Sequence, residues 1–299
     1  MKLFTIGVVF LASPAFALDV QPVADNIYAL VGPLGQRSPE NFGNNATFGV
    51  VVTPAGVVLI DAGASWLGAA DIDAAIDTFT DQPVKVVINT GGQDHRWFGN
   101  GYWQAQGAQI ITSADALADQ HDRFDEQMQR LVFFLKDAAD GTEATYADTV
   151  FESDYNLTLG GVEMQIIHSG AAHTPGDSFV WLPKAQVVFT GDIVFTERML
   201  GVQPHSIVKD WIESFETMAD LQSQWVIPGH GHAGTLSTAT ADTYDYLVNL
   251  RSKIGALIEE GGDIYDSTKI DQTAFDYLQN SEVWEGKNAQ QTFEQMEWE

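Results

Sequence analysis

The sequence predicts an α/β protein built as a four-layer αββα sandwich, in which two β-sheets lie face to face and helices cover both outer faces. Short apolar runs bounded by Gly, Pro or small polar residues occur in both halves of the chain, as in buried strands. Helical segments follow the strands in each half, and helices placed outside two sheets give this layered arrangement. Several apolar runs end at a His or an Asp, which predicts a cleft along one edge of the two sheets.

Residues 1–17 have the features of a secretory signal. Lys2 precedes an apolar stretch at residues 3–12, and Ala15-Phe16-Ala17 offers a cleavage site with small residues. We therefore expect residues 18–299 to form a single exported, periplasmic domain with a helical extension at its C-terminus. No other segment approaches the about 18 uninterrupted apolar residues of a membrane span, so we expect no stable membrane insertion.

The composition limits the possible partners and ligands. The chain has no cysteine, so disulfides and thiolate ligands are excluded. It carries 14 basic and 41 acidic residues, a formal charge of −27. A basic surface for nucleic acid or anionic lipid is therefore not expected. We expect the ligand to be a small-molecule substrate.

In the first half, turn and cap residues delimit the expected elements. Pro54 and Gly56 indicate a hairpin turn, and Ser113 or Asp115 is a suitable helix N-cap. We expect strands at residues 27–31, 47–52, 56–60 and 84–88, and helices at 67–80 and 113–140.

The second half repeats this pattern of strands followed by helices. Gly261-Gly262 ends a long helical segment. We expect strands at residues 155–159, 162–168, 178–182, 186–190 and 225–227, and helices at 209–223 and 237–259.

Four potential metal ligands follow apolar runs in order along the chain. His95, His173, Asp192 and His230 each lie in a loop after such a run. Zn²⁺ accepts imidazole nitrogen and carboxylate oxygen, and catalytic zinc sites keep one position open for water. One such residue would carry little weight, but four at successive strand ends predict a metal centre.

These motifs resemble the metallo-β-lactamase superfamily. Its ligand loop reads Asn-Thr-His-x-His-x-Asp-His, and later ligands lie in Gly-His-Thr-x-Gly, Gly-Asp and Pro-Gly-His-Gly. The matching segments here are Asn89-Thr90-Gly91-Gly92-Gln93-Asp94-His95-Arg96, Ala172-His173-Thr174-Pro175-Gly176, Gly191-Asp192 and Pro228-Gly229-His230-Gly231. The resemblance also covers Asp61, which follows a strand and lies beneath the metals in the family. The variant loop further resembles a periplasmic subset found beside quinoprotein dehydrogenases and sulfur-oxidation genes, which implies a possible redox-system partner.

The first two histidines of the family loop are replaced, and two alignments are possible. One anchors on Asp94-His95, places Thr90 and Gly92 at the histidine positions and needs one inserted residue. The other needs no insertion, but places Gly91 and Gln93 there and His95 at the aspartate. We favour the first, because it retains an Asp-His pair; His95 is a ligand candidate in both.

By resemblance, one of the family's two metal sites is complete and the other is not. The complete site takes Asp94, His95, Asp192 and His230, whereas the other retains His173 and the shared Asp192. Two protein ligands hold a divalent cation weakly. The resemblance thus implies a hydrolase with one Zn²⁺ per chain, acting on an ester, thioester or lactam-like carbonyl through metal-bound hydroxide.

Other polar residues near these motifs receive roles that the sequence leaves open. Asp94 is expected to orient the attacking water or accept its proton, and His173 to act as general acid/base or as a partial second-metal ligand. Arg96 either binds a substrate carboxylate or neutralises Asp94 or Asp61. Asp61 is expected to support a metal ligand by a hydrogen bond. His168 either does the same or is a core histidine. The competing hypothesis is a non-catalytic, metal-binding or accessory protein of a periplasmic dehydrogenase or sulfur-oxidation system.

Overall fold

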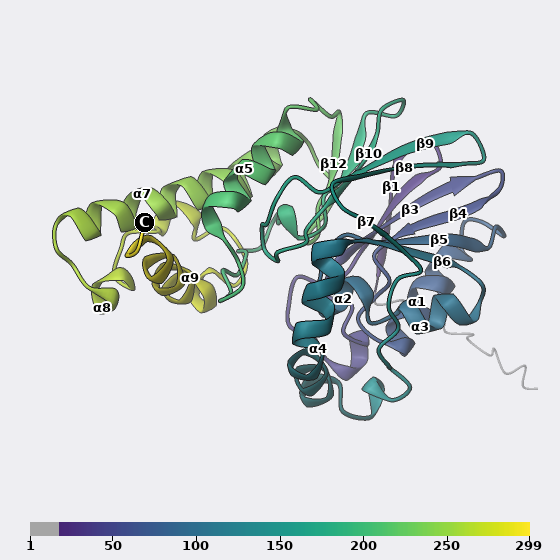
Figure 1. Cartoon of the computed structure of the whole chain (residues 1–299), viewed down its shortest axis with the longest axis horizontal. Helices are drawn as coiled ribbons and strands as arrows, with labels where there is room; N and C mark the ends of the chain where they lie inside the picture. Colours follow the sequence, from purple (N-terminus) through teal and green to yellow (C-terminus); the bar gives the residue numbers. More distant parts are fainter. Residues whose placement is uncertain (1–17) are drawn as a thin grey trace, which may run out of the picture.

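A computed structural model describes residues 18–299 and contains two β-sheets (Figure 1). The predicted signal segment lies outside the described residues. The seven-stranded sheet follows sequence order, antiparallel from β1 to β4 and parallel from β4 to β7. Its strands are β1 (Asp19–Ala24), β2 (Ile27–Val31), β3 (Thr47–Thr53), β4 (Gly56–Ile60), β5 (Val84–Asn89), β6 (Gln109–Ser113) and β7 (Thr149–Phe151).

The second sheet has five strands in the order β12-β11-β10-β9-β8. Its last pair, β11 and β12, is parallel, and the other neighbours are antiparallel. The strands are β8 (Asp154–Leu159), β9 (Val162–Ile167), β10 (Phe179–Leu182), β11 (Val187–Phe189) and β12 (Trp225–Ile227).

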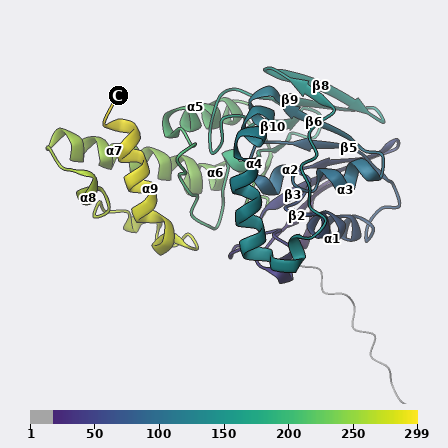
Figure 2. The same cartoon turned by 60° about the horizontal axis from the view of Figure 1, so that its bottom comes forward.

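The two sheets pack against each other, and helices cover their outer faces, which confirms the predicted αββα sandwich. Apolar residues of both sheets, such as Ile88 and Phe189, form the buried layer between them. A second cluster packs the first sheet against α1 (Trp66–Ile76) and α3 (Asn100–Ala105), and a third packs the second sheet against α5 (Val208–Ala219) and α7 (Asp245–Glu259). Figures 1 and 2 show these helices on opposite sides of the sandwich.

The remaining helices follow the predicted pattern with different ends. Ser113 caps α4 (Ala114–Leu135) by accepting a hydrogen bond from the amide of Ala116 (3.1 Å), and α4 then tightens into a 3₁₀ turn, Lys136–Ala139. The helix expected at 237–259 is instead α6 (Leu236–Ala239), a π-helical turn (Thr240–Tyr244) and α7. Strands β1, β6 and β7 were not predicted.

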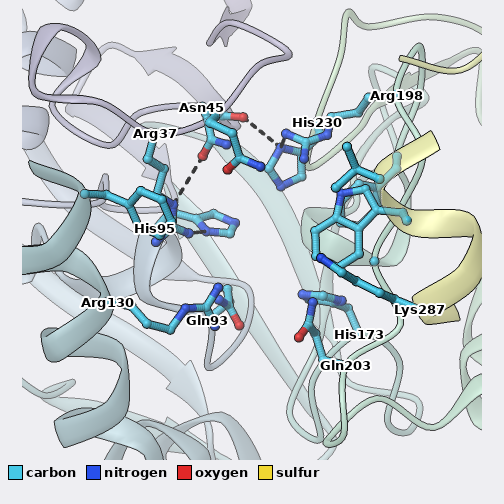
Figure 3. Close-up of a pocket in the computed structure, with 16 residues that line it drawn as sticks. Arg37, Asn45, Gln93, His95, Arg130, His173, Arg198, Gln203, His230 and Lys287 are labelled. Carbon is cyan, nitrogen blue, oxygen red and sulfur yellow. Dashed lines mark hydrogen bonds between the residues drawn. The ribbon is translucent and has the colours of Figure 1, made fainter. Parts of the chain in front are cut away.

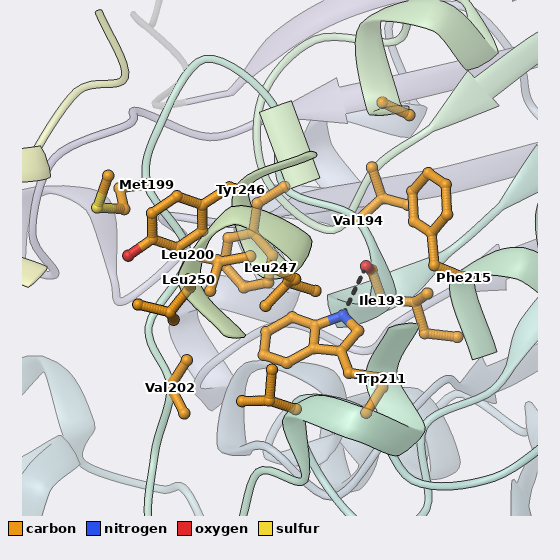
Figure 4. Close-up of a cluster of buried hydrophobic side chains, with 14 of the residues drawn as sticks. Ile193, Val194, Met199, Leu200, Val202, Trp211, Phe215, Tyr246, Leu247 and Leu250 are labelled. Atoms are coloured by element: carbon orange, nitrogen blue, oxygen red, sulfur yellow. Dashed lines mark hydrogen bonds between the residues drawn. The ribbon is translucent and has the colours of Figure 1, made fainter. Parts of the chain in front are cut away.

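The C-terminal segment packs onto the helices of the second sheet. It forms α8 (Ile264–Ser267) and α9 (Ser281–Met296), with Ala289 and Phe293 of α9 buried in the same cluster as α5 and α7. Within that cluster, the indole of Trp211 donates a hydrogen bond to the carbonyl of Ile193 (2.9 Å), which ties α5 to the loop after β11 (Figure 4). None of the helices in residues 18–299 is both long and apolar enough to cross a membrane.

The strand order brings the predicted ligand loops to one edge of the sandwich. Because β4 and β5 are parallel, as are β11 and β12, the carboxyl ends of each pair lie side by side. Asp61 follows β4, the loop with His95 follows β5, Asp192 follows β11, and His230 follows β12. A hydrogen bond from the amide of Thr47 to the carbonyl of Gly229 (2.7 Å) joins the two sheets at this edge.

Candidate metal centre

His95, Asp192 and His230 form a buried group able to hold a metal ion. One ligand atom from each lies within 4.8 Å of the others. Nε2 of His95 is 3.1 Å from Oδ2 of Asp192, and Nε2 of His230 is 3.3 Å from Oδ1. Two imidazole nitrogens and a carboxylate match a catalytic zinc site, which has three protein ligands and one open position.

The backbone fixes the orientation of His230. Its Nδ1 donates to the carbonyl oxygen of Asn45 at 2.8 Å, which leaves the lone pair of Nε2 directed at the group. Such a bond on the second ring nitrogen is the usual support of a metal-binding histidine. Burial lowers the pKa of His230, and the charge of Arg198 lowers it further, so that the imidazole stays neutral as ligation requires.

The imidazole of His95 lies between two carboxylates. Asp192 faces its Nε2, whereas Oδ1 of Asp94 lies 3.3 Å from its Nδ1. The guanidinium of Arg37 forms an ion pair with Asp94 and also lies 2.7 Å from Nδ1 of His95. Asp94 is therefore on the far side of His95 from the metal-binding group, and the structure does not bring it into that group.

Asp94 is ionised although it is fully buried. Burial alone would raise its pKa, but the charge of Arg37 and the hydrogen bond with His95 outweigh this and hold the pKa well below its usual range. Its ionised form suits a carboxylate that supports a ligand histidine.

Arg96 neutralises Asp192 of the metal-binding group and the buried Asp61 behind it. Its guanidinium has five N–H donors, and all five have acceptors: Asp192 takes two (2.6 and 3.2 Å), Asp61 one (2.8 Å), and the carbonyls of Thr47 and Gly229 one each (3.2 and 3.0 Å). The side chain is fully buried and is not among the residues that line the cavity beside the group. Arg96 thus takes the structural role, and the prediction that it binds a substrate carboxylate is corrected because no donor is left.

Two features of the structure accommodate Arg96. Gly229 approaches it so closely that a Cβ there would lie 2.5 Å from Nη2. Asp61 adopts a left-handed backbone conformation (φ 70°) at the end of β4 and also accepts hydrogen bonds from the amide and hydroxyl of Thr90 (2.8 and 2.9 Å). Asp61 is therefore joined to Asp192 through Arg96, and its support of a metal ligand stays a prediction.

The ligand loop exposes alternate side chains to one cavity. Gln93 and His95 line it, whereas Gly92 lies against Asp119. This placement favours the alignment without an insertion, in which Gly91 and Gln93 stand at the histidine positions.

Carboxylates fill the space beside both loop glycines. A Cβ on Gly91 would overlap the carboxylate of Asp177, and one on Gly92 would overlap that of Asp119. A histidine therefore does not fit at either glycine of this loop without rearrangement. Burial raises the pKa of Asp177 to about 8, so this carboxyl is largely protonated near neutral pH.

His173 faces the cavity but lies outside the group of three. Its ring contacts those of Trp211 and Phe195, at centroid distances of 5.4 and 5.7 Å, and His205 lies at 5.9 Å. Nδ1 of His173 has no hydrogen-bond partner among residues 18–299. Burial lowers the pKa of His173 to about 4, so it is neutral near pH 7 and can accept a proton.

His168 does not contact the group. Its Nδ1 faces the carbonyl of Asp177 (2.7 Å), and its Nε2 lies 3.2 Å from the carboxylate of Asp115. Neither nitrogen reaches Asp94 or Asp192, so the prediction that His168 supports a metal ligand is corrected in favour of a structural role, in which His168 links the loop before β10 to the first turn of α4.

The cavity beside the group measures about 250 Å³ and contains several residues that the sequence analysis missed (Figure 3). They come from four separate segments: the loop before β3, α4, the loop after β11, and α9. No local sequence pattern predicts that they converge; the one available signal is the scarcity of basic residues in this acidic chain. These residues are Arg37, Asn45, Arg130, Arg198 and Lys287.

Known proteins share this fold. A metallo-beta-lactamase type 2 of Elizabethkingia meningoseptica is 24% identical over 219 residues, 71% of this chain and 78% of the relative. A metallo-beta-lactamase of Pontibacter korlensis superposes with a TM-score of 0.61 at 23% identity, over 78% of this chain and 99% of that chain. A double mutant of a sec-alkyl sulfatase gives a TM-score of 0.67 at 15% identity, over 93% of this chain and 50% of that chain.

The family model of the metallo-beta-lactamase superfamily matches residues 43–230, the segment that carries all four predicted strand-end ligands. The chain therefore belongs to the metallo-beta-lactamase superfamily.

Proposed function

We propose that this protein is a hydrolase that uses one divalent metal ion, zinc by preference, to cleave an ester, thioester or lactam-like carbonyl compound. Membership of a superfamily of metallo-hydrolases supports the general class of activity. The observation that carries the one-metal assignment is the group of His95, Asp192 and His230, the one such group detected in residues 18–299.

The donor set fits a zinc ion. His230 has its Nε2 lone pair directed inward by Asn45, and Asp192 remains ionised, because the charge of Arg96 outweighs its burial and holds its pKa well below the usual range. When His95 binds a metal through Nε2, its proton must reside on Nδ1, where Oδ1 of Asp94 at 3.3 Å is the acceptor. Arg37, a pure donor, would shift away from that nitrogen.

A second metal site is disfavoured by charge and by space. The fully buried guanidinium of Arg96 already supplies a positive charge to Asp61 and Asp192. Gly91 and Gln93 supply no imidazole, and Gln93 is itself held by Arg123 (3.2 Å). Of the second ligand set, His173 and the shared Asp192 then remain.

A bound zinc ion would lower the pKa of a water molecule and polarise the carbonyl under attack. The chain's own residues then determine proton handling. His173, which lines the cavity and is neutral near pH 7, is the candidate to accept a proton there and return it to a leaving group. Asp94, separated from the open face by His95, orients that ligand rather than the nucleophile.

The proposed activity should be lost on removal of metal and regained on its return. We expect the zinc-loaded chain to hydrolyse at least one of a panel of aryl esters, thioesters and a chromogenic β-lactam. Treatment with a chelator should lower the rate by at least roughly 100-fold, since metal catalysis supplies several kcal/mol of transition-state stabilisation. Dialysis against Zn²⁺ should restore it.

Two outcomes would contradict the proposal. One is a zinc-loaded, folded chain that hydrolyses none of these compounds, which would favour a non-catalytic binding protein. The other is hydrolysis that persists unchanged after the chelator has removed all metal.

A further inference from the structure

The cavity beside the metal-binding group has a charge opposite to that of the protein. The chain has a formal charge of −27 and only 14 basic residues. Four of those basic residues line this one cavity, and no Asp or Glu of the described residues is among its lining. Such a concentration of cationic side chains around an open site favours an anionic ligand.

The four basic side chains differ in what they contact. Arg37 is paired with Asp94, and Arg130, which is half-buried, lies 4.0 Å from Glu126. Arg198 and Lys287 have no carboxylate within 4.0 Å among residues 18–299. Lys287 instead lies over the ring of Trp284, with Nζ 5.0 Å from its centroid, at the α9 side of the cavity.

Arg198 is the most informative of them because it is a buried charge without a counter-ion. It is 6% exposed, yet its Nε makes no hydrogen bond with any described residue. Its Nη1 lies 3.5 Å from Nδ1 of His230, but that nitrogen already donates its proton to Asn45. Buried charged groups are normally paired, and leaving donors unsatisfied is costly.

Arg96 is a buried arginine with a structural role in the same protein, and its contacts differ from those of Arg198. Both guanidinium groups are buried, but all five donors of Arg96 have acceptors and two carboxylates share its charge. Arg198 has neither, and it faces the open cavity in Figure 3 next to His230. A purely structural role would leave the arrangement of Arg198 unexplained.

The backbone holds Arg198 in place. Its amide donates to the carbonyl of Thr196 (2.7 Å), and the next amide, of Met199, donates to the carbonyl of Gln279 (2.9 Å). These two bonds hold the backbone at Arg198 between the metal-binding group and the C-terminal segment. A planar guanidinium at this place suits two parallel hydrogen bonds to an oxyanion.

We propose that the substrate of this site carries an anionic oxygen group, a carboxylate, sulfate or phosphate, that binds Arg198, with Lys287 contributing positive charge at the cavity wall. That the bound anion belongs to a substrate rests on the proposed function. The anion site itself does not depend on a metal. It places the anionic group beside His230, so that the bond to be cleaved lies within reach of the metal-binding group.

Anion binding can be measured on the full chain without any substrate. We expect sulfate, phosphate and acetate, each tested against chloride at constant ionic strength, to show saturable binding by calorimetry to both the chelator-treated and the zinc-loaded protein. Arg198→Met should weaken the binding of the preferred anion by on the order of 10- to 100-fold, the range for a hydrogen bond to a charged group. Arg198→Lys should weaken it less.

Lys269→Met is the control, because Lys269 is exposed, pairs with Asp266 and is not among the residues that line the cavity. It should bind the anion as the native chain does. Circular dichroism of each variant checks that it is folded. Equal anion affinity in the native chain and folded Arg198→Met, or no saturable anion binding by the native chain, would overturn the proposal.

A substrate pair separates this proposal from the proposed function. Two aryl esters with the same leaving group, one with a neutral and one with a carboxylate-bearing acyl chain, should differ in kcat/KM by about 10-fold or more in favour of the anion, and Arg198→Met should reduce that ratio. Hydrolysis with a ratio near one overturns the anion preference but not the hydrolase. Arg198-dependent anion binding without hydrolysis overturns the hydrolase but not the anion site.

Discussion

Replacing Arg96 by methionine is expected to lower the free energy of unfolding by about 3–5 kcal/mol, because it leaves the carboxylates of Asp61 and Asp192 buried without their shared counter-charge. Methionine fills much of the volume of the arginine side chain. The loss of stability therefore reflects the missing charge and hydrogen bonds more than the creation of a cavity. Arg96→Lys, which retains the charge but loses the two-pronged contact with Asp192, should fall between methionine and the native residue. Urea unfolding followed by circular dichroism measures all three.

The control for this experiment is a surface arginine with a similar partner. Arg251 pairs with Glu299 through Nη2 at 2.5 Å, but both side chains reach solvent. Arg251→Met should therefore cost less than about 1 kcal/mol. If Arg96→Met costs no more than Arg251→Met, Arg96 does not have the role assigned to it here.

Replacing His230 by alanine is expected to abolish stable metal binding and to lower hydrolase activity by at least roughly 100-fold, since a metal contributes several kcal/mol to the transition state. The variant keeps only His95 and Asp192 of the group, and two ligands hold a divalent ion weakly. Elemental analysis of the purified variant measures the metal, and the rate with the best compound of the panel measures the activity.

His232, two residues further along the same loop, provides the matched control. It is exposed and pairs with Glu197 (2.8 Å) and Asp19 (3.5 Å), away from the metal-binding group. His232→Ala should keep its metal and its rate. Retention of metal and activity by folded His230→Ala would exclude His230 as a ligand.

The sequence was sufficient to predict the layers and all three residues of the metal-binding group. Asp192 and His230 follow short, strongly apolar runs that read as buried strands, and parallel pairing of β11 and β12 puts their ends together. Helix α4 was also predictable, because Ser113 is a favourable N-cap before an amphipathic segment.

Other helices and strands have too weak a local sequence pattern to be predicted. Strand β6 reads Gln-Ile-Ile-Thr-Ser, with only two strongly apolar residues, and its buried position is decided by pairing with β5 rather than by its own pattern. The helix predicted across 237–259 is interrupted by a π-helical turn, which no Gly or Pro marks.

The site differed from expectation where contacts between residues far apart in the sequence determine the direction of a side chain. Neighbouring residues Asp94 and His95 were expected to bind the same metal, but the ion pair of Asp94 with Arg37 turns the carboxylate to the opposite side of the imidazole. Arg37 comes from a loop more than fifty positions away, and Arg198 and Lys287 come from the second half of the chain. Such convergence depends on the packed tertiary structure and leaves no periodic pattern in the sequence.

We expect one metal ion to bind per chain, at His95, Asp192 and His230. The most direct test is to count the metal in the full chain after equilibration with excess Zn²⁺ and removal of loosely bound ion, by elemental analysis against protein concentration. We predict one zinc per chain for the native protein and none for Asp192→Asn. Two tightly held zinc ions per chain, or none, would contradict the account.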